Sequence, residues 1–171
     1  LDISNADADG MTVSGTITGN STGAVTISNL SAGAGGITIS SCIADGGLGG
    51  TVGILQNSAT AVLTLSYNAN QFTGPTAITS GKVKLGAQYA LWKSPYDTTG
   101  STGAIGLDVT GQVAPVIGGL AGGVDLATAV TAYGSVTGLT LNPQTGTSVS
   151  YSGVIANGAS NMTLAKTGDG T

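Results

Sequence analysis

The stretch NADADG, residues 5–10, is the part of the sequence whose residue types and spacing come closest to a chemical site. Asn5, Asp7 and Asp9 offer oxygen atoms at alternate positions, as the first half of a calcium-binding loop does, and Gly10 allows a sharp turn. The position at which such a loop supplies a bidentate Glu is Thr16, so water or backbone would have to complete the site. The stretch predicts either calcium binding or a solvated acidic turn before the first strand.

Catalysis has little support in the residue types of this chain. Asp7 and Asp9 could form the carboxylate pair of a polysaccharide-degrading β-helix enzyme. Such sites usually have further acidic, His or Arg partners, and the sequence contains no His, no Arg and no Glu. Ser and Thr hydroxyls are abundant, but without His their activation would fall to lysines such as Lys82 and Lys84. We therefore expect a protein that is not an enzyme, with no catalytic residues and no cofactor other than the calcium alternative.

A second candidate site is ALWKSPYDTTGSTG, residues 90–103, which carries the only Trp of the chain. Its Ser, Pro, Asp and Gly residues predict a loop that leaves the wall of the fold. Trp92 and Tyr96 could pack this loop down, or they could present an aromatic surface to carbohydrate.

The overall composition restricts both the fold and the partners. The 171 residues include 30 Gly and are 40% hydrophobic but only 7% charged, with a net charge of −4. Gly without a G-X-Y period excludes collagen, and the apolar content argues against disorder. Nucleic-acid binding is not expected, because it needs clustered cations and the chain has few. Membrane insertion is not expected either, because every apolar stretch is interrupted by polar residues or Pro. Low charge density weakens the repulsion between copies, so self-association is expected.

The elements that would position these residues are short strands that recur at a fixed interval along the sequence. Val13, Val25 and Ile37 are twelve residues apart, as are Ile27 and Ile39, and each alternates with Thr or Ser. A sandwich or barrel usually needs bulky inward residues, whereas a β-helix can fill its narrow interior with small aliphatic side chains. The sequence predicts an all-β solenoid, with residues 1–171 forming a single β-helix domain or a segment of a longer array.

Residues 63–86, LTLSYNANQFTGPTAITSGKVKLG, resemble the autotransporter-associated β-strand repeat. Residues 139–171 are similar to the segment that precedes such a unit, through YSGVI and KTGDGT. Tyr67 departs from the usual glycine, and the loop with Trp92 has no counterpart. The matching positions are Thr64, Leu65, Ser66, Asn70, Phe72, Thr73, Gly74, Thr76, Ile78, Gly81, Leu85 and Gly86.

This resemblance implies a right-handed parallel β-helix in a secreted or surface-displayed bacterial protein, and it brings no catalytic residues. The leading prediction is a non-catalytic structural protein, a subunit or segment of an extracellular filament, stalk or surface layer that assembles head to tail. The alternatives are an adhesin or carbohydrate-binding passenger fragment and, third, the polysaccharide-degrading enzyme.

The two ends of the chain are the predicted assembly interface. In the repeat pattern KTGDGT is followed by a strand, and this chain begins with LDISN, so that joining the ends nearly restores the unit. We expect either one period of a tandem polypeptide or separate subunits that meet where the motif is divided. The predicted interface comprises Leu1, Asp2, Ile3, Lys166, Thr167, Gly168, Asp169, Gly170 and Thr171.

Overall fold

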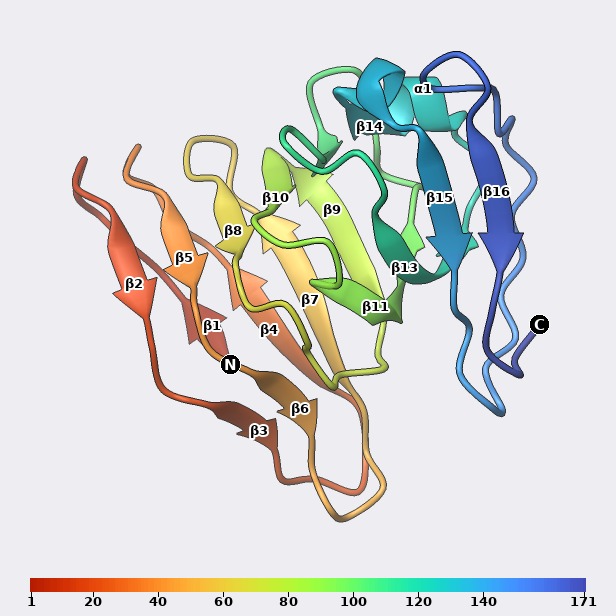
Figure 1. Cartoon of the computed structure of the whole chain (residues 1–171). Coiled ribbons are helices and arrows are strands. Elements are labelled where there is room, and N and C mark those ends of the chain that lie inside the picture. The colour runs from red at the N-terminus through yellow and green to blue at the C-terminus, as the bar shows by residue number, and fades with distance from the viewer.

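The structure is a computed structural model that describes residues 1–171, and it is a β-solenoid of about 7 turns. The strands follow one another along a single axis from the N-terminal to the C-terminal end (Figure 1). Helical structure is confined to α1 (Leu126–Ala129) and the 3-10 turn η1 (Tyr133–Ser135). The all-β, parallel β-helical fold predicted from the sequence is confirmed.

Two parallel sheets form the main walls of the solenoid. The 8-stranded sheet contains, in spatial order, β1 (Asp2–Ile3), β4 (Val25–Asn29), β7 (Val52–Asn57), β9 (Thr76–Ser80), β11 (Leu91–Asp97), β13 (Val116–Ala121), β15 (Gly138–Leu141) and β16 (Thr163–Lys166). The 6-stranded sheet contains β14 (Val130–Thr131), β12 (Gly106–Asp108), β10 (Lys82–Leu85), β8 (Leu63–Leu65), β5 (Ile37–Ile39) and β2 (Met11–Val13). A 2-stranded sheet of β3 (Ile17–Gly19) and β6 (Ile43–Asp45) adds a short third wall in the first coils.

The twelve-residue interval in the sequence is half of a coil. Val13 lies in β2 and pairs with Ile39, whereas Val25 lies in β4, in the other main sheet. One early coil therefore takes 26 or 27 residues, as the hydrogen bonds between stacked positions also show. The coil length then varies, because the stacked positions Gly74 and Ser94 are 20 residues apart, whereas Asn142 and Thr167 are 25 apart. The repeated apolar positions thus alternate between two walls.

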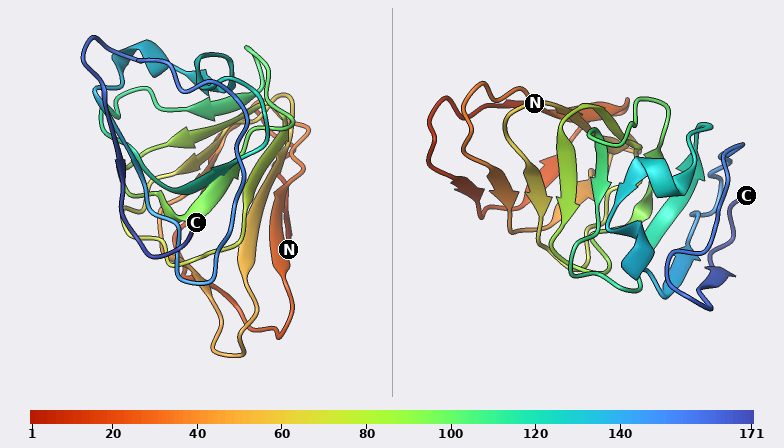
Figure 2. Two further views of the ribbon diagram at one scale, coloured as in Figure 1. Left: turned by 90° about the vertical axis from the view of Figure 1, so that its right-hand side faces the viewer. Right: turned by 90° about the horizontal axis from the view of Figure 1, so that it is seen from above.

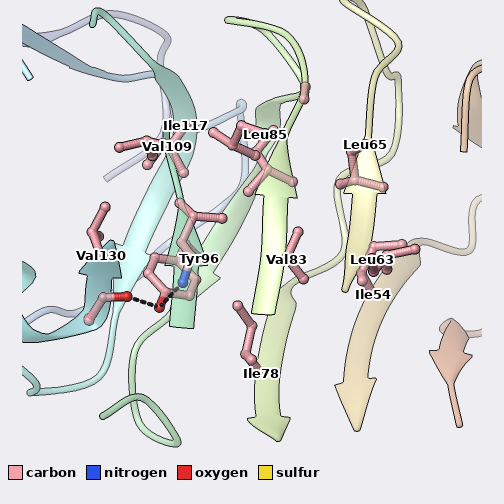
Figure 3. Close-up of a cluster of buried hydrophobic side chains, with 14 of the residues drawn as sticks. Ile54, Leu63, Leu65, Ile78, Val83, Leu85, Tyr96, Val109, Ile117 and Val130 are labelled. Atoms are coloured by element: carbon pink, nitrogen blue, oxygen red, sulfur yellow. Dashed lines mark hydrogen bonds between the residues drawn. The ribbon is translucent and has the colours of Figure 1, made fainter. Parts of the chain in front are cut away.

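Inward-facing side chains stack in columns along the axis. The register of the 6-stranded sheet places Ile37, Leu63, Val83, Leu107 and Val130 in one line, and all five are buried. Figure 3 shows part of this column facing residues of the 8-stranded sheet. Burying a side chain of this size contributes about 1.5 to 3 kcal/mol. These aliphatic columns supply the core that a sequence poor in aromatic residues can build.

Buried polar groups are satisfied by hydrogen bonds that cross from coil to coil. Asn70 lies in the turn after β8, where its Oδ1 accepts from the Ile43 amide at 2.9 Å and its Nδ2 donates to the Ala90 carbonyl at 3.0 Å. No buried side-chain nitrogen or oxygen lacks a partner. Asn70 therefore connects three successive coils, which gives this motif position a structural role.

Residues 90–103 do not form the predicted excursion from the wall. Leu91–Asp97 is strand β11 of the 8-stranded sheet, and only the residues after it turn away. The pairing of β11 with β13 shifts register between Leu91 and Pro95. Such a bulge absorbs extra residues and admits a proline that cannot donate to the sheet. The polar, proline-containing sequence was therefore misread as a loop.

Leu63→Ala should lower the free energy of unfolding by about 2 to 5 kcal/mol, because it opens a cavity in a column that cannot collapse around it. Leu63 is 1% exposed, whereas Leu48, in the turn after β6, is 56% exposed. Leu48→Ala is the matched control and should stay within about 0.5 kcal/mol of the wild type. Urea denaturation followed by circular dichroism measures both, and equal effects would contradict the stacked core.

Candidate functional site

Tyr96 belongs to the core, so the prediction that it presents an aromatic surface to a ligand is wrong. Its side chain is fully buried and stands in register between Thr76 and Leu120. The hydroxyl donates to the Ala129 carbonyl at 2.9 Å and accepts from the Leu107 amide at 3.2 Å (Figure 3). Burial raises the pKa of this hydroxyl above its ordinary value. An inward position on β11 made this residue part of the core rather than of a surface.

Trp92 is half-buried, and its ring is held in place. The indole Nε1 donates to the Asn70 carbonyl, one coil earlier. The Lys93 Nζ lies 4.7 Å from the ring centroid and also donates to the Gln71 Oε1 at 2.6 Å. These contacts fix the orientation of the indole. Lys93 is also held in place, by the Trp92 ring and by Gln71.

A groove of about 500 Å³ lies beside Trp92, across β11, β13, β15 and β16. We call it the Trp92 groove. Asn142 closes one side, with its Nδ2 donating to the Trp92 carbonyl at 2.9 Å and its Oδ1 accepting from the Thr167 hydroxyl at 3.1 Å. Its lining consists of Gln88, Tyr89, Trp92, Ala114, Val116, Gly138, Thr140, Asn142, Thr163 and Thr167.

The acidic N-terminal stretch forms a turn in which the Asn5 side chain bonds to the backbone. The Asn5 Oδ1 accepts from the Asp7 amide at 3.1 Å, and its Nδ2 donates to the Asp9 carbonyl at 2.6 Å. Asp7 and Asp9 are exposed. Nowhere in the chain do three or more His, Cys, Asp or Glu side chains come together as metal ligands. The exposed turn predicted for this stretch is present, and its calcium-binding alternative stays a prediction.

The two ends of the chain lie on opposite edges of the 8-stranded sheet (Figures 1 and 2). On β1, the carbonyls of Leu1 and Ile3 accept from the amides of Ser28 and Leu30 at 2.8 and 3.0 Å. Since alternate residues of a parallel strand bond to opposite neighbours, the backbone groups of Asp2 point away from the solenoid. The β1 edge is therefore open to another strand.

The β16 edge is open in the same way. The amides of Thr163 and Thr167 donate inward to the carbonyls of Thr137 and Leu141, at 3.0 and 2.8 Å. By the same alternation, the N–H and C=O groups of Leu164 point outward. All four residues of β16 are exposed.

Residues 167–171 pack along the preceding coil. The Gly170 amide donates to the Pro143 carbonyl at 3.0 Å, and Thr171 exchanges backbone bonds with Thr147 and Val149. Neighbouring strands of the 8-stranded sheet are separated by a full coil of sequence. A strand that began directly after Thr171 would follow β16 by only a few residues, so it could not pair with β16 as a neighbour in this sheet. Contact between the ends of two copies would instead place β1 beside β16.

Comparison of the chain with protein families, with curated proteins and with solved structures found no match. The likeness to the autotransporter-associated repeat therefore stays a prediction. No helix of the structure is long and apolar enough to cross a membrane.

Two features of these surfaces were not found from the sequence. Tyr89 lines the groove although its own neighbourhood reads as a turn, and its position three residues before Trp92 was the available signal. Leu164 is the exposed end of a core column, since it stands in register with buried Leu139. Alternation in NMTLAK identifies it as inward-facing, but only the structure of residues 1–171 shows that its side chain is exposed.

Tyr96→Phe should cost about 1 to 3 kcal/mol of stability, because it leaves the buried Leu107 amide and Ala129 carbonyl without their partner. Tyr67→Phe is the matched control, since Tyr67 is exposed, and it should be close to neutral. Chemical denaturation of both variants measures the difference. A Tyr96→Phe variant as stable as the wild type would overturn the assignment of Tyr96 to the core.

Stability should also fall in alkali, since burial and the nearby Asp125 raise the pKa of Tyr151 to about 12 from 10.0. Between these values the unfolded chain loses the proton before the folded chain does, so stability decreases as the pH rises from about 10 to 12. Burial also raises the pKa of Tyr96 and Tyr133, which adds to the effect. Tyr151→Phe should show a shallower decrease in thermal melts over this range, and an unchanged slope would contradict it.

Proposed function

We propose that the chain is a non-catalytic structural protein that assembles head to tail through the two ends of its solenoid. The observation that carries this proposal is that β1 and β16 are opposite, open edges of one parallel sheet. All strands of that sheet run in the same direction, so a second copy can place β1 beside β16 without a change of orientation. A contact between two different surfaces produces an open filament when the rotation from copy to copy does not close a ring.

The proposed joint follows from the backbone groups that each edge leaves free. The Asp2 amide of one copy would donate to the Leu164 carbonyl of the next, and the Lys166 amide would donate to the Asp2 carbonyl. This register places Leu1 against Leu164. Strand addition at an open edge obtains affinity from such main-chain bonds and specificity from the side chains between them.

Apolar side chains at both ends support the same arrangement. Leu164 continues the column of buried Leu139 and is 53% exposed. Because Asp2 pairs with Ser28, the preceding Leu1 stands in line with buried Ile27. Leu1 itself is 63% exposed. Stacking of two copies would join the two columns and remove both leucines from water, which is favourable at about 25 cal/mol per Å² of apolar surface.

The proposed location is extracellular or on the cell surface, in a filament, stalk or surface layer of a bacterium. This part of the proposal rests on the resemblance of residues 63–86 and 139–171 to the surface-displayed repeats. A low charge density and a backbone-driven contact suit a passive, extended structure, in which no residue needs to act as a reagent.

Leu164→Lys should raise the concentration needed for assembly at least about tenfold, because it replaces the apolar contact with Leu1 by a second inward charge beside Lys166, which stands in register with Leu141. The residue is exposed, so the monomer should keep its fold and melting temperature. Sedimentation velocity and electron microscopy over a concentration series measure assembly.

Leu48→Lys is the matched control, since Leu48 is equally exposed but lies in a turn away from both edges, and it should assemble as the wild type does. A wild-type chain that stays monomeric at every concentration would overturn the head-to-tail proposal. Assembly that survives Leu164→Lys would show that the contact lies elsewhere.

A further inference from the structure

We propose that the Trp92 groove is a binding site for a neutral saccharide. The groove lies on the face of the wall formed by β13, β15 and β16, with Val116, Gly138, Thr140 and Thr163 contributed by these strands. Its volume of about 500 Å³ falls within the range of about 300 to 1,000 Å³ that is usual for small-molecule sites. This role uses side chains, including Thr163 of β16, whereas the proposed assembly uses the free backbone groups of β1 and β16.

The aromatic side chains of the groove offer apolar faces that are already positioned. Tyr89 is 41% exposed and lies in the turn between β10 and β11, where its amide donates to the Asn68 Oδ1 at 3.1 Å. Trp92 is fixed through its indole nitrogen and is covered on one face by Lys93. An aromatic ring carries negative charge density on its face, which attracts the weakly positive C–H groups on one side of a sugar ring. Tyr89 is the more accessible of the two platforms.

Four polar side chains in the groove have no hydrogen-bond partner within the protein. They are the amide of Gln88 and the hydroxyls of Tyr89, Thr140 and Thr163, whereas Asn142 and Thr167 bond to each other. Hydroxyls both donate and accept, and an amide offers two donors and an acceptor. A set of this kind matches sugar hydroxyls, which also serve in both roles.

The charges around the groove select a neutral ligand. No charged residue lines it, and Lys93, the neighbour of Trp92, contacts the Trp92 ring and the Gln71 Oε1. An anion would find no cation to pair with, and a cation would find no carboxylate. A ligand that has many hydroxyls, apolar ring faces and no charge satisfies all three features of the lining, and a neutral saccharide has these properties.

The decisive variant is Tyr89→Ala, because Tyr89 lines the groove without filling the core. Tyr67→Ala is the matched control. The exposed fraction of Tyr67, 38%, is similar to that of Tyr89, and Tyr67 does not line the groove. A second variant, Thr140→Val with Thr163→Val, removes two free hydroxyls and keeps the volume of the wall. Thermal melts of all three variants establish that they are folded.

The probes are soluble neutral polysaccharides, namely an α-glucan, a β-glucan, a mannan and a galactan, with anionic alginate as the charged comparison. Affinity electrophoresis should show at least one neutral polysaccharide retarding the wild type and Tyr67→Ala equally. Isothermal titration with the corresponding hexasaccharide should give an affinity at least tenfold lower for Tyr89→Ala and severalfold lower for the double threonine variant.

Three results would overturn the saccharide site. They are no retardation by any of the four neutral polysaccharides, an affinity of Tyr89→Ala equal to that of the wild type, and binding of alginate as tight as that of the neutral probes.

Sedimentation of the same samples distinguishes the saccharide proposal from the assembly proposal. Tyr89→Ala should assemble as the wild type does, because Tyr89 is not part of either edge strand.

Discussion

Parallel backbone pairing between successive coils is the constraint on which the rest of this structure depends. Each strand inside a sheet bonds to the strand one coil before it and the strand one coil after it, so its inward side chains lie directly over others. A side chain of the wrong size or polarity in one coil therefore disturbs its neighbours above and below. The buried column from Ile37 to Val130 and the coil-crossing bonds of Asn70 are two ways of meeting this requirement.

The unusual composition follows from the same constraint. Coils that stack closely bring backbone near backbone, and a Cβ on Gly46 would lie 1.7 Å from the Gly19 carbonyl oxygen. Only glycine fits at such a contact. Outward positions need solubility rather than bulk, which Thr and Ser provide, so few charges are required. Sequences of this kind can build a thin core.

The ends and the side wall of a solenoid have different physical properties, and the two proposals use them separately. The ends have unpaired backbone groups and uncovered apolar columns, exemplified by Leu164, and these are the features that the assembly proposal uses. On the side wall, binding depends on side chains that line its outer face and on Tyr89 in the turn beside it. A filament built through the ends would present one such groove for every copy along its length.

The sequence by itself determined the fold class, because alternation of Val and Ile with Thr and Ser is a local property of each strand. It could not determine the coil length, because the twelve-residue interval could equally be half a coil or a whole coil. Only the pairing of Val13 with Ile39 shows that the interval is half a coil. Tertiary structure also decided the roles of the aromatic residues. Tyr96 and Trp92 look alike in sequence, but the bulge in β11 places one in the core and the other beside an open groove. Burial and neighbours one coil away assign these roles, and both are set by stacking across 20 or more residues.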